Sequence, residues 1–172
     1  SLLSLQSEAV RDPSDRALFE RSRERVISMA LVHEQLIHAE NLSLIPFRQY
    51  LTDLSEHIHH AHANEAITLS VECDDVALEI DRAVPCGVIV NELTTNALEH
   101  AFPQGNAGRI RIEFSKSETS YLLAVSDSGV GMPMEPNRSL GLTLVDALVA
   151  QLHAELSVSS GSGTRVELRI PV

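Results

Sequence analysis

Residues 91–100 read NELTTNALEH, inside a largely apolar segment from Ala83 to Phe102 that predicts a long helix. At 3.6 residues per turn, Glu92, Asn96 and His100 fall on one face of that helix. Most of the other side chains are valine, isoleucine, leucine and alanine, so a row of polar groups is unusual for a helix that must be largely buried. A carboxylate and an amide oxygen one turn apart are the hard ligands that Mg²⁺ prefers. The helix therefore carries a candidate metal-binding face.

The segments around this helix show alternating strand and helix patterns. Further helices are predicted over 46–63 and 140–152, and strands over 67–72, 76–80, 109–114, 121–126, 155–159 and 164–170. The acidic pair Asp74-Asp75 is expected to form a hairpin turn between the first two strands, and Gly161-Ser162-Gly163 a turn between the last two. Helices on one face of a mixed, mostly antiparallel sheet give an α+β fold, a two-layer α/β sandwich.

The N-terminal residues have a different pattern. Leucines at the very start are typical of a helix end, and Asp12-Pro13 predicts that a second helix begins there and runs to about Glu40. A hairpin of two amphipathic helices is too small to bury its own apolar stripe, so it needs a partner, most simply a second copy in a four-helix bundle. We therefore divide the chain into a helical hairpin, residues 1–43, and a sandwich domain, residues 44–172.

Two further motifs follow the long helix along the chain. The first, Asp127-Ser128-Gly129-Val130-Gly131, comes directly after a predicted strand. A carboxylate at a strand end can accept a hydrogen bond from an adenine amino group, and glycines allow a nucleotide to approach the backbone. The second, SLGLTLV at residues 139–145, begins a helix, whose free N–H groups can meet a phosphate. Each motif alone is weak, because the first is often a plain turn and the second a plain capped helix.

In combination the motifs resemble a known superfamily. The order NELTTNALEHAFP, DSGVGM, SLGLTLV and GSGTRVELRIPV is similar to the N box and glycine boxes of the GHKL ATPases, which have the Bergerat fold. SMALVHEQL followed by PFRQYLTDL resembles histidine kinases of the second HisKA type, and SLLSLQSEAV is similar to the stretch after their phospho-acceptor histidine. The related HWE kinases carry a tryptophan motif; this chain has no Trp, which favours the sister group.

The resemblance implies an ATP site with a bound Mg²⁺. Asn96 would hold the metal against the phosphates, Glu92 would orient the metal or polarise the attacking group, and Asp127 would read the adenine amino group with support from Thr164. The residues that it places at the nucleotide are Asn96, His100, Asp127, Gly129, Gly131, Met132, Ser139, Leu140, Gly141, Leu142 and Thr164.

The implied reaction is in-line transfer of the γ-phosphoryl group to a histidine and then to an aspartate of a response-regulator receiver domain. The resemblance also implies a homodimer formed through the hairpin and an upstream sensor domain. The acceptor histidine is expected upstream of Ser1, so we predict that this chain binds ATP without phosphorylating itself. Glu99 departs from the family, which often has a lysine there that contacts a phosphate. Arg138 could supply this contact instead. Few other substitutes exist, because Lys116 is the single lysine of the chain.

Composition limits the classes of function. The 172-residue chain is 44% hydrophobic and has a net charge of −11, so nonspecific binding to nucleic acid or an anionic membrane is not expected. Cys73 and Cys86 form no CxxC pair and are expected to be reduced, which favours a cytoplasmic location. No apolar run reaches the ~20 residues of a membrane span, although the parent protein could be membrane-anchored.

Several other features have simpler interpretations. His33 lies on the apolar stripe of the hairpin and is better read as a packed side chain than as an acceptor. The cluster of His57, His59, His60 and His62 lacks an HExxH pattern and is better read as a solvated helix face than as a metal site. The arginines at 21, 23 and 25 predict another solvated face, with contact to a response regulator as the alternative.

Two alternative functions remain open. A degenerate GHKL module could bind a receiver domain as a scaffold without phosphorylating it, and Glu99 keeps this hypothesis open. A serine kinase of the anti-sigma-factor type is the other; the N-terminal hairpin counts against it, because those proteins lack that element.

Overall fold

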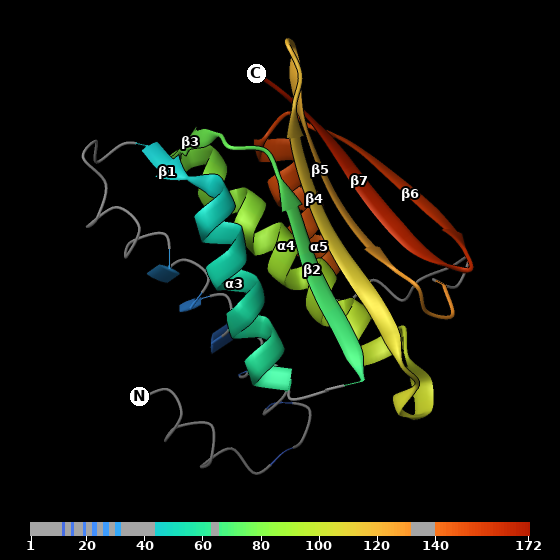
Figure 1. Ribbon diagram of the computed structural model, residues 1–172. Coiled ribbons are helices and arrows are strands. Elements are labelled where there is room, and N and C mark those ends of the chain that lie inside the picture. The colour runs from blue at the N-terminus through green and yellow to red at the C-terminus, as the bar shows by residue number, and fades with distance from the viewer. Residues whose placement is uncertain are drawn as a thin grey trace.

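The computed structural model describes residues 44–62, 66–131 and 140–172 as continuous segments (Figure 1). Single positions are also described between Asp12 and Leu31, and each of those from Asp15 onward has helical backbone. The rest of the predicted hairpin, residues 1–43, lies outside the described residues. The boundary at residue 43 therefore stays a prediction.

A five-stranded sheet is the centre of the fold. Its strands are β2 (Ile67–Cys73), β4 (Gly108–Lys116), β5 (Ser120–Asp127), β7 (Gly163–Pro171) and β6 (Glu155–Gly161), in that spatial order. β2 and β4 are parallel, which requires a crossover, and the other three pairings are antiparallel. The predicted turn around Ser162 is confirmed, because β6 ends at Gly161 and β7 begins at Gly163.

Three helices cover one face of this sheet, as Figure 1 shows. They are α3 (Phe47–His62), α4 (Ile80–His100) and α5 (Leu140–Gln151), and a short 3₁₀ turn (Pro103–Gly105) follows α4. α4 lies between its neighbours and contacts both α3 and α5. The predicted α+β fold, a two-layer sandwich, is confirmed. The crossover from β2 to β4 runs through α4, so the long helix is held at the centre of its layer.

The predicted hairpin between residues 67–72 and 76–80 is wrong. β3 (Ala77–Glu79) does not pair with β2 but with β1 (Leu44–Pro46), a strand that the sequence pattern missed, in a separate two-stranded sheet. Asp74 is tied to β4 instead: its N–H donates to Phe114 O at 2.9 Å, and its Oδ2 accepts from Lys116 N–H at 2.8 Å. The acidic pair therefore follows the end of β2, beside the end of β4, and the chain continues through β3 into α4.

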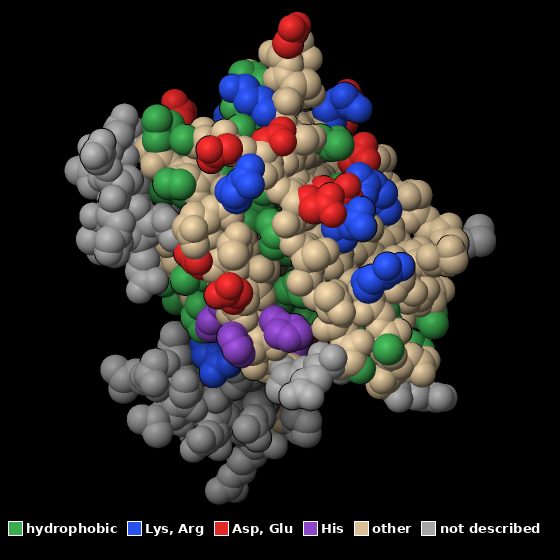
Figure 2. Space-filling model, viewed as in Figure 1, with side chains coloured by type: hydrophobic (Ala, Val, Ile, Leu, Met, Phe, Trp, Pro, Cys, Tyr) green, Lys and Arg blue, Asp and Glu red, His purple; other side chains and the backbone are tan. Residues whose placement is uncertain are grey.

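The two faces of the sheet differ in chemistry. The face under the helices carries the core, where Phe47, Phe114 and Tyr121 pack with ring centroids 4.5 and 5.5 Å apart. The other face carries ion pairs, and Figure 2 shows Arg, Lys, Asp and Glu side chains interspersed over the strands. Arg165 pairs there with Glu113 and with Glu167, and these contacts, above all the hydrogen bond to Glu113, raise the pKa of Arg165. No described helix covers this charged face.

The C-terminal end of α5 places a non-glycine residue in left-handed backbone. His153 has φ +52°, and Ala154 N–H donates back to Val149 O at 3.0 Å, as in a helix that ends on a left-handed residue. We expect His153→Gly to raise the free energy of unfolding by about 0.5 kcal/mol and His153→Val to lower it by about 1 kcal/mol, because glycine relieves the strain and a β-branched residue increases it. Urea unfolding of the two variants measures both changes. Equal stability of the glycine and valine variants would contradict this account.

Candidate functional site

The polar face of α4 runs from the interior of the protein to its surface. Glu92 is buried, with 4% exposure, Asn96 is half-buried, and Glu99 and His100 are exposed. Glu99 Oε2 lies 3.6 Å from His100 Nε2. The helix is formed as predicted, except that it begins at Ile80, one turn earlier than the pattern indicated. One carboxylate is therefore held inside the fold, one turn from a half-buried amide, at the end of α4 that faces the glycine motifs.

Asp127 ends β5, and its carboxylate is fixed from one side. Its Oδ1 accepts hydrogen bonds from Gly129 N–H at 2.8 Å and from Thr164 N–H at 3.3 Å. Its Oδ2 accepts none from the described residues. The contact predicted between Thr164 and Asp127 is thus made directly, through the main chain of β7. The carboxylate is therefore oriented through Oδ1 alone among the described residues.

Gly129 joins the Asp127 turn to the end of α4. A Cβ at Gly129 would lie 2.2 Å from Ala101 O and 2.6 Å from Ala101 Cβ, so only glycine fits there without movement of backbone. The next residue, Val130, donates its N–H to Ala101 O at 3.0 Å. The structure therefore brings together the first two predicted clusters, since the helix that carries Asn96 ends directly against the turn that carries Asp127.

The β6–β7 hairpin closes the other side of this turn. Gly163 has φ +110°, and a Cβ there would lie 2.0 Å from Asp127 O. Gly131 has φ +83°, and a Cβ there would lie 2.8 Å from Gly161 O. Both positions need glycine for conformation and for space. The glycine motif and the C-terminal hairpin are therefore one packed unit around Asp127.

The third predicted cluster is described only in part. Gly141 is buried near the start of α5, Leu142 packs against the core, and Leu140 is 57% exposed. Met132 and Ser139 lie outside the described residues. The contact between α4 and α5 puts this helix start in the same layer as the polar face of α4.

Two residues at the site were not singled out from the sequence. Ala101 supplies the surface on which Gly129 and Val130 rest. Ser128 holds the turn to β4, because its N–H donates to Arg109 O and its Oγ accepts from Arg109 N–H, both at 3.0 Å. Neither role has a sequence signal of its own, since alanine at a helix end and serine in a turn are common.

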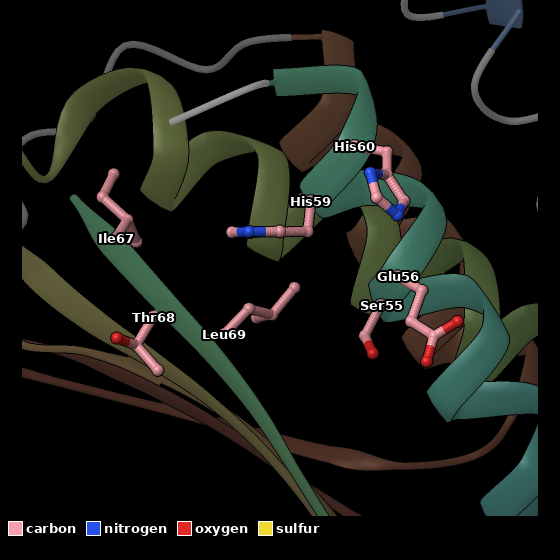
Figure 3. Close-up of a pocket in the computed structure, with 7 residues that line it drawn as sticks. All are labelled: Ser55, Glu56, His59, His60, Ile67, Thr68 and Leu69. Atoms are coloured by element: carbon pink, nitrogen blue, oxygen red, sulfur yellow. The ribbon is translucent and has the colours of Figure 1, made fainter. Parts of the chain in front are cut away.

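The histidine cluster lies elsewhere, at the C-terminal end of α3. His59, His60 and Glu56 line a pocket of about 310 Å³ between α3 and β2, together with Ser55, Ile67, Thr68 and Leu69. In Figure 3 the His59 ring extends from α3 toward β2, whereas the Glu56 carboxylate points away from the strand. In the described part of the chain, no group of three or more His, Cys, Asp or Glu is arranged to hold a metal ion.

The two cysteines are free thiols in the described structure. Burial raises the pKa of Cys86 to about 12 and that of Cys73 to about 11. Both are therefore protonated at neutral pH. Among the described helices, none combines the length and apolarity that crossing a bilayer requires.

Comparison with known proteins agrees with this geometry. Residues 1–62 match a family model described as histidine kinase, and residues 81–172 match the model for histidine kinase-, DNA gyrase B- and HSP90-like ATPases. Blue-light-activated histidine kinase 2 of Erythrobacter litoralis is 32% identical over 90% of this chain and 47% of its own length. Sensor histidine kinase PdtaS of Mycobacterium tuberculosis is 32% identical over 100% of this chain and 36% of its own length. The chain thus spans half or less of these relatives.

A solved structure extends the match to three dimensions. The histidine kinase domain of the Erythrobacter litoralis EL346 blue-light-activated histidine kinase superposes with a TM-score of 0.79 at 31% identity, covering 88% of this chain and 74% of that domain. The similarity therefore includes the layer arrangement as well as the motifs. The chain belongs to the histidine kinases, and its C-terminal part belongs to the family of histidine kinase-, DNA gyrase B- and HSP90-like ATPases.

Proposed function

We propose that this chain is the ATP-binding, phosphoryl-donating part of a sensor histidine kinase in a two-component system. The observation that carries the proposal is the Asp127 carboxylate, whose Oδ1 is held by Gly129 and Thr164 while Oδ2 accepts no hydrogen bond from the described residues. An anionic acceptor at a fixed position suits the exocyclic amino group of adenine. Guanine has a carbonyl oxygen at the equivalent position and would meet a second acceptor there.

The phosphate end of the nucleotide would lie along the polar face of α4. Asn96 and Glu92 supply an amide and a carboxylate one turn apart, and Mg²⁺ usually combines one or two such ligands with phosphate oxygens and water. Asn96 would hold the metal through its side-chain oxygen, and the buried Glu92 would orient it. The metal would supply charge neutralisation on the phosphates during transfer. Gly141 and Leu142, at the start of α5, would border the phosphates.

Transfer would pass the γ-phosphoryl group to a histidine and from there to an aspartate of a receiver domain. The described chain contributes positioning, through Asp127 at the base and Asn96 at the phosphates. We also propose that the full-length protein dimerises through its N-terminal helices, which the histidine kinase match over residues 1–62 supports. The same match weighs against a serine kinase of the anti-sigma type.

Calorimetry with the 172-residue chain tests the proposal. Titrations with ATP and with ADP, each with and without Mg²⁺, should give micromolar dissociation constants, with a larger effect of Mg²⁺ on ATP. No binding by a sample that is folded by circular dichroism would favour the scaffold alternative, in which the fold is kept and the ligand is lost.

Glu99 offers a quantitative test of where the phosphates lie. Its carboxylate shares the polar face of α4, so it repels the triphosphate, whereas lysine at the same position attracts it. We expect Glu99→Lys to tighten ATP binding about three- to tenfold at low salt, with a smaller gain at high salt because exposed charges are screened. The matched control is Glu118→Lys, an exposed position in the β4–β5 turn at the other end of the sheet, with the same change in net charge. Equal gains in both variants would show that only net charge matters and that the phosphates lie elsewhere.

A further inference from the structure

We propose that Ser128 is a positioning residue that sets the direction of the Asp127 carboxylate and thereby the preference for adenine. The inference rests on the proposed function, because it concerns the same nucleotide site. The first observation is the pairing of β4 with β5. At the C-terminal end of β5, the last pair of residues in this ladder is Ile110 with Asp127.

Beyond this pair, Ser128 replaces one ladder bond with a side-chain bond. In a regular antiparallel pair, Arg109 and residue 128 would exchange two backbone hydrogen bonds. Here Ser128 N–H donates to Arg109 O at 3.0 Å, but Arg109 N–H donates to Ser128 Oγ at 3.0 Å rather than to the Ser128 carbonyl. The hydroxyl thus satisfies the strand partner while the main chain turns out of the sheet, in the way that serine side chains commonly compete with backbone ladders.

Because the Ser128 carbonyl is not bound to Arg109, the main chain after Ser128 can turn toward α4. Val130 N–H reaches Ala101 O at 3.0 Å, and Gly129 rests against Ala101 with no room for a Cβ. Gly129 N–H in turn donates to Asp127 Oδ1. The direction of the carboxylate therefore depends on a chain that leaves the sheet at Ser128.

Loss of the hydroxyl leaves Arg109 N–H with two choices. It can bond to water, or it can take the carbonyl of residue 128 and extend the strand by one pair. The second choice draws Gly129 away from Ala101 and rotates the Asp127 carboxylate. Because Arg109 and Ser128 are both exposed, the cost to the fold is small in either case. Ligand selection should suffer more than stability.

The test compares ADP with IDP, which lacks the adenine amino group and carries a carbonyl oxygen in its place. The unmodified chain should bind ADP more tightly than IDP. Ser128→Ala should weaken ADP binding about five- to tenfold, which is the loss expected for one well-placed hydrogen bond, and leave IDP binding nearly unchanged. Ser128→Thr, which keeps the hydroxyl, should restore the preference. Ser157→Ala, an exposed serine on β6, is the matched control and should change neither affinity.

The outcomes separate the inference from the function on which it rests. If the unmodified chain prefers ADP and Ser128→Ala keeps the same ADP-to-IDP ratio, Ser128 does not set the preference. If Ser128→Ala weakens both nucleotides equally, its role is general support of the fold, and the inference is also overturned. If the unmodified chain shows no preference for ADP, the adenine-reading role of Asp127 fails first, and with it the role of Ser128. Melting temperatures of all variants, measured without nucleotide, confirm that the compared samples are folded.

Discussion

Replacing Gly87 with alanine should lower the free energy of unfolding by about 2 kcal/mol, although alanine is the better helix former. Gly87 lies within α4, where the exchange alone would gain up to about 1 kcal/mol. A Cβ there would lie 1.7 Å from the hydroxyl oxygen of Tyr50 and 2.5 Å from its ring carbon Cζ. Tyr50 is fully buried in the core, so its ring can move only by displacing its packed neighbours, and overpacking of this kind costs about 1–3 kcal/mol. The clash should exceed the gain in propensity.

Chemical denaturation of Gly87→Ala, Tyr50→Phe and the double variant measures this contact. The double variant should be more stable than the sum of the single changes predicts, because phenylalanine lacks the oxygen that lies nearest to the new methyl group. Gly161→Ala serves as the control, since a Cβ there meets no atom within 4 Å. A Gly87→Ala protein at least as stable as the unmodified chain would show that α3 and α4 are not in such close contact.

Asp127→Asn should reduce ADP affinity roughly 100-fold while the fold is kept. The charge-assisted hydrogen bond to adenine is lost, and the amide N–H₂ of asparagine then faces the adenine amino group, which is also a donor. Gly129 N–H and Thr164 N–H both point at Oδ1 and will hold the amide oxygen of asparagine in that place. The amide nitrogen must then occupy the position of Oδ2 and face the amino group of adenine. The same change should improve IDP binding, since inosine presents an acceptor there.

Calorimetry with ADP and IDP on both proteins gives the four affinities required. A reversal of the ADP-to-IDP preference is the expected signature, and a general defect in folding cannot produce it. Retention of full ADP affinity by Asp127→Asn would show that this carboxylate does not read the base. Glutamate at position 127 is a useful comparison, because it keeps the charge and moves it by one methylene.

Most elements of the fold could be predicted from local pattern. The apolar run in α4, the alternation in β4 and β5 and the glycines at the β6–β7 turn each indicate their structure within a single segment. Two predictions failed: the strand β1 was missed, and the pairing of β2 with β3 was wrong. β3 follows β2 after a short acidic turn, which is typical of a hairpin, yet β3 pairs with β1 and β2 pairs with β4. The partner of a strand depends on which strand edges remain free once the helices have packed, and a short stretch of sequence does not contain that information.

For the candidate site too, the sequence predicted the residue types but not how they lie relative to one another. The types of residue, a carboxylate and amide on one helix and an aspartate before two glycines, were visible in the sequence and carried the resemblance to the histidine kinases. Their relation in space was not visible, since α4 and the Asp127 turn meet through Ala101, and the turn is anchored by Ser128 and by the main chain of Thr164.

The sequence by itself determined most of the helices and strands, the residue types in the three motifs, and the family to which the chain belongs. Those properties depend on side-chain type and on spacing of a few residues. Only the tertiary structure decided why Gly87, Gly129 and Gly163 must lack a side chain and which oxygen of Asp127 accepts the main-chain hydrogen bonds. Those properties depend on contacts between segments far apart along the chain, where a single methyl group or one N–H decides the outcome.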